Sequence, residues 1–232
     1  MDFDGRHVVV TGGTGALGTA VVGTLLERGA TCHVPWIHRE EAERFPHRAH
    51  AGVRLVESGE LSEEAAVERL YAPLPALWAS VHIAGGFAGG AIEHTEAATL
   101  KRQVESNFLS CYLCCRAAVR AMLKSGGGRI VNVAARPALE WRAGAGMSAY
   151  GASKAAVAAL TTALGEELAG RGILINAVAP STMDTPANRK SMPKANFDRW
   201  PKVEEVAAEI VHLASPANAV ARGAIVTVYG KS

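Results

Sequence analysis

The sequence predicts an α/β protein, a single doubly wound domain in which a parallel sheet of seven strands carries helices on both faces. Two observations support this fold class. Short runs that are apolar throughout alternate with longer helical patterns almost to the end of the chain, as in sheets buried on both faces. The chain has 232 residues, of which 49% are hydrophobic and 20% charged, and this suits one domain with a substantial core over residues 1–232.

The first half of the chain contains four of the strands. The run HVVVT at residues 7–11 is the first strand, and a glycine-rich turn leads from it into a helix at residues 16–28. A later helix, SEEAAVERLY, carries acidic residues in its first turn, where the positive end of the helix dipole favours them. In chain order, the remaining elements of this half are expected at residues 30–37 (strand), 53–56 (strand), 62–71 (helix) and 78–83 (strand).

The second half contains three strands and the longest helices. The run GGGRIVNVA is the fifth strand and lies between two long helical patterns, and ILINAVA and AIVTVY are the last two strands. In chain order, these elements are expected at residues 96–124 (helix), 126–134 (strand), 149–169 (helix), 173–179 (strand), 203–214 (helix) and 224–229 (strand).

Composition and charge argue against several classes of protein. The formal net charge is +2, from 24 basic and 22 acidic side chains, and no basic block indicates a nucleic-acid or membrane partner. The N-terminus lacks the positive charge and long apolar stretch of a secretory signal, and no run approaches the roughly 18 apolar residues of a membrane span. We therefore expect a cytoplasmic protein that acts on a small molecule.

Three of the four cysteines crowd one predicted helix. Cys111 and Cys115 are one turn apart and Cys114 lies between them, whereas Cys32 belongs to the second strand. A metal site would need more ligands, and no suitably spaced histidine or aspartate lies nearby in the sequence. We therefore expect buried thiols in a helix of the core or of a subunit contact, and no metal.

The turn after the first strand is rich in glycine, in the sequence VVVTGGTGALGTAVV. Gly13, Gly15 and Gly18 match the pattern G-x-G-x-x-G, which between a strand and a helix predicts a dinucleotide site of the Rossmann type, although a purely structural turn is the alternative. Glycine permits the tight turn, and the start of the helix supplies amide donors for a pyrophosphate. The expected cofactor contacts here are Gly12, Gly13, Thr14, Gly15, Ala16, Leu17 and Gly18.

The end of the second strand bears on the choice between NADH and NADPH. No acidic residue stands at this position to accept from the ribose hydroxyls; Trp36 and Ile37 occupy it, and His38 and Arg39 follow. With no carboxylate to repel a 2′-phosphate and an arginine close enough to pair with one, we favour NADP(H), and NAD(H) is the alternative. Further along, Glu60 is either an acceptor for the adenine amino group or a simple exposed acid.

Tyr150 and Lys154 are four residues apart, which is one turn of a helix, and a cation beside a phenol stabilises the phenolate. Together with TGGTGALG, IAGG, Asn107, YGASK and NAVAPSTMDT, this pair makes the chain resemble the short-chain dehydrogenase/reductase family over essentially its whole length. The resemblance implies that Tyr150 transfers the proton while nicotinamide transfers the hydride. It also implies that Lys154 lowers the tyrosine pKa and binds the nicotinamide ribose, and that Asn107 continues a proton relay through water.

Residues 180–201 form the one long irregular piece of the chain, and a segment of this length inside a compact domain is typically a lid over a site. The family resemblance implies that the start of this piece contacts the nicotinamide carboxamide, through the Met183 backbone and the Thr185 hydroxyl. Other cofactor contacts implied by the resemblance are Pro180, Ala84, Gly85 and Gly86.

Two departures from the family pattern indicate one subgroup. Ala16 replaces the middle glycine of the loop, and Ala134 and Ala135 stand where the family has its catalytic serine. Ser148 belongs to the turn that enters the next helix and is not counted as a replacement. Within the family, dihydropteridine reductases are similar in both respects and in the segments AGGFAGG, NVAARPAL and MDTPANRKSMPKANF, whereas Asn107 and the missing acid depart from them.

The missing serine fits a particular substrate class, and an enzyme whose activity has decayed is the alternative. Reducing a ketone builds negative charge on one oxygen, so a second donor helps to stabilise it. Hydride added to a quinonoid dihydropterin leaves charge spread over several heteroatoms, so Tyr150 can be the sole donor. The expected substrate contacts are Phe87, which either faces a flat ring or packs beneath the cofactor, Ala135 and Asn188.

Three hypotheses for the function follow. The first is a reductase of a quinonoid dihydropterin or a similar conjugated substrate, and the second is a general carbonyl or enone reductase. The third is a non-catalytic NAD(P)-binding sensor, which would not need Tyr150, Lys154 and Asn107. The helices that carry Asn107 and Tyr150 are rich in Ala, Cys and Leu, and this composition predicts a homodimer or homotetramer formed through them.

Overall fold

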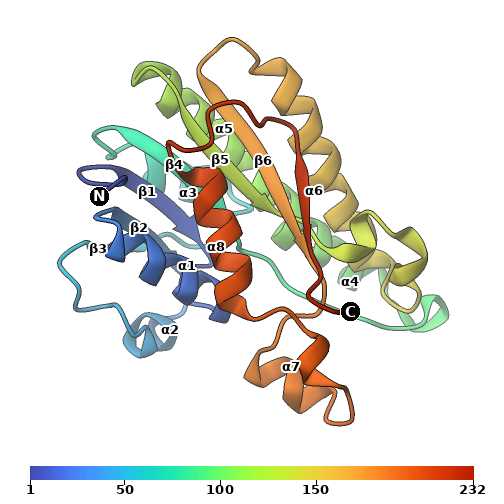
Figure 1. The fold of residues 1–232 in the computed structure, drawn as a ribbon. Helices are drawn as coiled ribbons and strands as arrows, with labels where there is room; N and C mark the ends of the chain where they lie inside the picture. The colour runs from blue at the N-terminus through green and yellow to red at the C-terminus, as the bar shows by residue number, and fades with distance from the viewer.

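The structure is a computed structural model that describes all 232 residues. Its centre is a sheet of seven parallel strands in the order β3-β2-β1-β4-β5-β6-β7 (Figure 1), which confirms the predicted fold class. The strands are β1 (His7–Thr11), β2 (Thr31–Trp36), β3 (Val53–Glu57), β4 (Leu77–His82), β5 (Gly128–Val133), β6 (Ile173–Pro180) and β7 (Ile225–Val228).

The strand order reverses between β1 and β4. The chain builds outward from β1 to β3, returns to place β4 on the other side of β1, and continues outward to β7. Since all the strands run in one direction, their carboxyl ends share one edge of the sheet. At such a reversal the loops diverge and leave a crevice, which is where open parallel sheets bind ligands.

Helices cover both faces of the sheet (Figure 1). On one face, α1 and α8 lie side by side, and their Leu25 and Ile210 are fully buried in one apolar cluster with the strands. On the other face, Leu70 and Leu113 belong to a second cluster beneath α3, α5 and α6. Burying each such side chain contributes roughly 1.5–3 kcal/mol. The α-helices are α1 (Ala16–Glu27), α2 (Arg39–Arg44), α3 (Glu64–Tyr71), α4 (Ala97–Gln103), α5 (Ser110–Lys124), α6 (Ser148–Glu167), α7 (Pro186–Ser191) and α8 (Val203–Ala214).

The single helix expected at residues 96–124 is divided. After α4, a π-helical segment, η2 (Val104–Leu109), precedes α5. Such segments are rare and often mark functional sites. This one carries Asn107, so the interruption sets the direction of that side chain. None of the helices combines the length and the apolar character that crossing a membrane requires.

The piece at residues 180–201 is more ordered than the sequence predicted. It contains α7 and a 3₁₀ turn, η5 (Phe197–Arg199), and projects beyond the carboxyl edge of the sheet (Figure 1). The Thr185 hydroxyl oxygen accepts from the backbone nitrogen of Asn188 at 3.1 Å and so caps α7. Pro186 suits the first helical position. The short helix α2 was also not predicted, because six residues carry too little periodicity to detect.

Candidate active site

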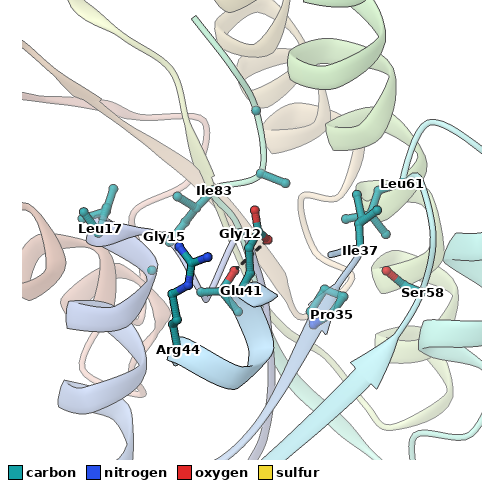
Figure 2. Close-up of a pocket in the computed structure, with 15 residues that line it drawn as sticks. Gly12, Gly15, Leu17, Pro35, Ile37, Glu41, Arg44, Ser58, Leu61 and Ile83 are labelled. Carbon is teal, nitrogen blue, oxygen red and sulfur yellow. Dashed lines mark hydrogen bonds between the residues drawn. The ribbon is translucent and has the colours of Figure 1, made fainter. Parts of the chain in front are cut away.

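A cavity of about 520 Å³ opens at the carboxyl edge, beside the start of α1 (Figure 2). Most of the residues expected to contact the cofactor in the glycine turn and after β4 line it. These residues are Gly12, Thr14, Gly15, Ala16, Leu17, Gly18, Ala84 and Gly85. Gly13 is buried beneath the turn, where a Cβ would lie 2.7 Å from the Val34 side chain, and Gly86 lies further along the loop.

Close approach of the backbone requires glycine at two positions of the turn. Gly12 has a φ of +66°, and a Cβ there would lie 2.8 Å from the Ala84 nitrogen. A Cβ on Gly18 would lie 2.1 Å from the Gly12 carbonyl oxygen. Ala16, in contrast, is the exposed first residue of α1, so its methyl group is accommodated where the family pattern has glycine.

The start of α1 fits a pyrophosphate. Gly15 is the N-cap residue, and no side chain caps this end of the helix. The amides of the first helical turn have no intrahelical acceptor, and the helix dipole adds positive potential there. An anion at this end of the cavity would therefore meet free donors on a backbone that no side chain blocks.

The residues after β2 are placed differently from the sequence expectation. His38 is exposed, and Arg39 is 82% exposed and pairs with Glu43 at 3.0 Å, so neither lines the cavity. Glu41 and Arg44 line it instead. At 3.6 residues per turn, Arg39 and Glu43 lie on one face of α2, and Glu41 and Arg44 lie on the opposite face. The second face turns toward the cavity, so Arg39 points away from it.

The far wall of the cavity also differs from the expectation. Glu60 is exposed and lies outside the cavity, whereas Ser58 and Leu61, on either side of it in the sequence, line the wall with Pro35 and Ile37. Three of these four side chains are apolar. The wall therefore suits a flat, weakly polar group better than a charged one.

Tyr150 and Lys154 occupy the first two turns of α6. Lys154 is 6% exposed and donates from Nζ to the Val133 carbonyl, at the end of β5, over 2.7 Å. A Cβ built on Gly85 would lie 3.7 Å from the same Nζ, so the lysine also adjoins the loop that lines the cavity. The helix that carries Tyr150 and the cavity thus meet at Lys154.

Burial shifts the pKa values of the pair in opposite directions. Loss of water raises the pKa of Tyr150 to about 12 and lowers the pKa of Lys154 to about 8. The lowered tyrosine pKa that the family resemblance implied is therefore not found, because the lysine charge is directed at the Val133 carbonyl and does not offset desolvation of the phenol. A phenol with this pKa is protonated near pH 7, which suits a proton donor.

Asn107 lies in the π-helical segment and is 1% exposed. Its Oδ1 accepts from the Gly86 nitrogen at 2.9 Å, and its Nδ2 donates to the Gly86 oxygen and to the Ser153 Oγ, each at 3.0 Å. The side-chain amide therefore fixes the loop after β4 against α6. This is a positioning role, and the proton relay implied by the resemblance stays a prediction.

The end of β5 offers no hydroxyl group. Ala134 and Ala135 are 1% and 4% exposed, and Ser148 is an exposed residue at the start of α6. Phe87, from the loop after β4, is 65% exposed and lies edge-on to Tyr150, with ring centroids 5.1 Å apart and an interplanar angle of 74°. The Tyr150 phenol thus has an exposed aromatic ring as its neighbour.

The residues expected to hold the carboxamide lie where the predicted lid, residues 180–201, begins. Pro180 ends β6, and the Met183 carbonyl accepts from the Asn188 Nδ2 at 2.8 Å. Thr185 caps α7 through its hydroxyl oxygen and keeps its own proton free to donate. Asn188, expected to contact substrate, therefore uses its Nδ2 within the lid, while its Oδ1 forms no hydrogen bond with the protein.

Sequence reasoning missed several residues of the site. Glu41 and Arg44 belong to a polar stretch, REEAER, whose only signal was the spacing of three between them. Ser58 and Leu61 flank the residue that was expected there. Ser153 was visible inside YGASK, but its bond to Asn107 depends on the packing of η2 against α6.

A second polar cluster lies in the core. All four cysteines are free and buried, which confirms the prediction for Cys111, Cys114 and Cys115. Ligand atoms of His82, Cys111 and Cys115 lie within 4.8 Å of one another. However, the two ring nitrogens of His82 lie 2.8 Å from the Ser80 Oγ and 2.8 Å from the Asn132 Oδ1. Since both nitrogens are hydrogen-bonded, the cluster stabilises the core and offers no free imidazole to an ion.

A parallel sheet with a glycine turn at its point of reversal, next to a half-buried tyrosine and a buried lysine one turn apart, defines a dinucleotide-dependent oxidoreductase. The family model described as short chain dehydrogenase matches residues 6–196. The chain belongs to this family of NAD(P)-dependent oxidoreductases.

Relatives in this family have different activities in their names. The chain is 31% identical to a 2,3-dihydroxy-2,3-dihydro-p-cumate dehydrogenase of Pseudomonas putida, over 100% of this chain and 96% of the relative. It is also 31% identical to the dihydropteridine reductase of Dictyostelium discoideum, over 88% of this chain and 86% of the relative. A solved structure of a short chain dehydrogenase/reductase family protein has a TM-score of 0.91 and 27% identity, and the match covers 99% of this chain and 98% of that chain. Similarity therefore establishes the family, and the substrate has to be inferred from the residues of the site.

Proposed function

We propose that this protein transfers a hydride from a nicotinamide cofactor to a quinonoid dihydropterin or a similar conjugated substrate, with Tyr150 as the proton donor. The observation that carries the proposal is the absence of a hydroxyl at the end of β5, where Ala134 and Ala135 accompany the tyrosine–lysine pair. Reduction of a ketone is favoured by two hydrogen-bond donors at the reacting oxygen, whereas this site supplies only one, Tyr150. The similarity to a dihydropteridine reductase supports the same substrate class.

The cavity is the proposed cofactor site. A bound nicotinamide dinucleotide would supply the hydride. The glycine turn and the amide end of α1 bind the pyrophosphate, and Lys154 binds the nicotinamide ribose. Met183 and Thr185 hold the carboxamide at the root of the lid. We favour NADP(H) over NAD(H), because no carboxylate stands at the end of β2.

Tyr150 gives its proton to the reduced ring. Its raised pKa keeps the phenol protonated at neutral pH, so the donor is ready before hydride transfer. The positive charge of Lys154 then stabilises the phenolate that remains, until water returns the proton. This division of roles needs the lysine in its charged form.

Three residues are the proposed substrate contacts. The exposed ring of Phe87, edge-on to Tyr150, offers an aromatic surface to a flat ring. Ala135 contributes a methyl group at the place where a serine hydroxyl would donate to the oxygen of a ketone substrate. Asn188 keeps its Oδ1 free to accept from a ring N–H or amino group.

A second candidate is a general carbonyl or enone reductase. The match to a dihydrodiol dehydrogenase over the full chain favours it, because that relative is named for chemistry at carbon–oxygen bonds. A water molecule or a lid group would then replace the serine.

Initial rates distinguish the candidates. Quinonoid dihydropterin, generated chemically, is compared with ketones, enones and quinones, each with NADH and with NADPH. We expect the pterin to give the highest kcat/KM by about tenfold or more. Higher values for ketones or enones would support the second candidate. Cofactor binding without turnover of any compound would leave the sensor hypothesis.

We also propose a homodimer or homotetramer formed through the helices that carry Asn107 and Tyr150. Leu100, Val104 and Tyr112 recur every four or eight residues along α4, η2 and α5, and are 44%, 37% and 43% exposed. A stripe of this kind suits helix packing against a second copy.

A further inference from the structure

A second cavity, of about 370 Å³, opens at the edge of the sheet opposite to the first. Its walls are residues at or just before the amino ends of β1, β4 and β5, together with the turn that enters β6. The strands run for roughly 17 Å between the two edges, so this amino-edge pocket is separate from the cofactor cavity. None of its lining residues is acidic, and its polar and aromatic side chains are Arg6, His7, Trp78, Ser125 and Arg129.

Two arginines pack on the indole of Trp78. The guanidinium carbon of Arg6 lies 3.6 Å from the centre of the indole, and that of Arg129 lies 5.2 Å from it. Both arginines and the tryptophan are half-buried. An aromatic face attracts a guanidinium but does not cancel its charge. Two positive charges therefore lie close together in one pocket.

Neither arginine has a carboxylate partner. No ion pair of the protein includes Arg6 or Arg129. The acids of the N-terminal segment, Asp2 and Asp4, pair instead with Arg28 and with the N-terminal amine. Loss of water and the charge of Arg6 both lower the pKa of Arg129, so the two cations oppose each other. An anion bound between them would offset this repulsion.

Backbone carbonyls hold the two guanidinium groups in place. Arg6 donates from Nε to the Asp2 carbonyl at 3.0 Å. Arg129 donates from Nε to the Asn218 carbonyl and from Nη1 to the Gly128 carbonyl, each at 2.9 Å. Both Nη atoms of Arg6 and the Nη2 of Arg129 are left without an acceptor in the protein. These donors are fixed before a ligand arrives, so an anion would bind them with little loss of side-chain freedom.

We propose that the amino-edge pocket binds a phosphate group, either as inorganic phosphate or as a small phosphate monoester, between Arg6 and Arg129. A phosphate carries close to two negative charges at neutral pH and matches both cations, whereas a single carboxylate would match one. Gly126 and Gly127 form part of the wall, so no side chain blocks the approach there. The volume of the pocket suits a small molecule.

The test is nuclear magnetic resonance of the full chain with ¹⁵N-labelled tryptophan, in which each of the four indole N–H groups gives one signal. The Trp78 signal reports the amino-edge pocket, and the Trp36 signal, from the end of β2, reports the cofactor cavity. Trp78→Phe and Trp36→Phe assign the two signals. Sodium phosphate and glycerol 3-phosphate are titrated separately, and sodium chloride keeps the ionic strength constant. We expect the Trp78 signal to follow a saturable curve, and the phosphate with the lower Kd identifies the source of the group.

Three variants and a control locate the phosphate. Arg6→Gln and Arg129→Gln are each expected to raise the Kd measured at Trp78 at least about tenfold. Ser125→Asp should raise it as much, because it adds a carboxylate to the pocket. The Ser125 hydroxyl is bonded only to backbone carbonyls, so this variant keeps every bond of the arginines and covers the case in which Arg129→Gln disturbs the fold. Lys124→Gln, at an exposed residue outside the pocket, is the matched control and should change the Kd by less than about twofold.

Three results would overturn the inference. The first is a Trp78 shift of equal size with chloride and with phosphate, which would show charge screening without a site. The second is a response of the Trp36 signal alone, which would assign the phosphate to the start of α1. The third is a Kd that stays unchanged in both arginine variants and in Ser125→Asp. Since no turnover is measured, failure of the proposed function would leave this test intact.

Discussion

Two side chains, Tyr150 and Lys154, lose most of their water when α6 packs onto the sheet. Burial favours the neutral form of each, so the pKa of the phenol rises to about 12 and the pKa of the ammonium falls to about 8. Near pH 7 the tyrosine is therefore an intact acid and the lysine is mostly charged. The pair supports proton donation at neutral pH and loses its cation above pH 8.

Tyr150→Phe tests the proton donor. The substitution removes only the hydroxyl, so we expect kcat to fall by roughly 10²–10⁴ while the Kd for the cofactor changes by less than about twofold. Steady-state rates and calorimetric titration give the two values. Turnover that stays within about tenfold of the unmodified protein would show that another group donates the proton.

Lys154 makes cofactor binding depend on pH. Its folded-state pKa is about 8, so the ammonium loses its proton as the pH rises above that value. Bonds to the ribose favour the charged form and raise the pKa in the complex, so binding above pH 8 should take up a proton and weaken with pH. Titration at pH 8.5 in buffers of different ionisation enthalpy measures this uptake. Binding with no proton uptake at that pH would remove Lys154 from the ribose site.

The lowered pKa of Lys154 weakens cofactor binding as the pH rises, but it has the opposite effect on the stability of the fold. Between pH 8 and the ordinary value of 10.5, the unfolded chain keeps the Lys154 proton that the folded chain releases. The contribution of this lysine to the free energy of unfolding therefore increases with pH across that window.

At the scale of elements, short segments position the site. The π-helical η2 brings Asn107 against Gly86 and Ser153, and α2 brings two charges to the cavity. The predicted lid is held at its base by Asp184, whose nitrogen donates to the Pro201 carbonyl at 2.9 Å and whose carboxylate pairs with Arg189 and Lys202. These pairs hold the pKa of Asp184 well below its usual range.

Asp184→Asn should loosen the lid. The amide cannot form both ion pairs, so α7 and the exit of the lid lose their common anchor. We expect KM for the substrate to rise several-fold and limited proteolysis within residues 184–202 to accelerate. Asp198→Asn, in the same lid but without an ion pair, is the control. Unchanged KM and proteolysis in Asp184→Asn would show that the lid is held by other contacts.

The strands and the long helices could be predicted from the sequence, and the short helical segments could not. Strands such as β1 and β6 are apolar almost throughout. The glycine turn and the spacing of Tyr150 and Lys154 are local patterns that the sequence itself shows. In contrast, α2 and α7 each span six residues, and η2 is a local irregularity whose Asn107 finds its partners, Gly86 and Ser153, far away in the sequence. For the same reason Arg39 was expected at the cavity, because which face of α2 turns inward is decided by packing.

At the scale of the whole molecule, the order of strands places every proposed role at one edge. The loops after β1, β4, β5 and β6 supply the phosphate turn, Phe87, Ala135 and the lid. The fold therefore fixes where the site lies, and the side chains at this edge decide its chemistry and its substrate.

Val104→Glu tests the proposed assembly. A charge in the exposed apolar stripe of η2 should prevent packing against a second copy, so light scattering after size-exclusion chromatography should give a monomer mass where the unmodified chain gives a multiple. Val220→Glu, at a residue that is 82% exposed and outside the stripe, should leave the mass unchanged. A monomeric unmodified chain, or an assembly that survives Val104→Glu, would contradict this interface.

We propose that Tyr150 suffices as the one proton donor because the substrate spreads the charge. The most direct test is kcat/KM for quinonoid dihydropterin and for a ketone, in the unmodified protein and in Ala135→Ser. We predict that the pterin is preferred by about tenfold or more in the unmodified protein, and that the added hydroxyl raises the ketone value roughly tenfold while the pterin value changes by less than about twofold. A ketone value that exceeds the pterin value before the substitution would contradict the account.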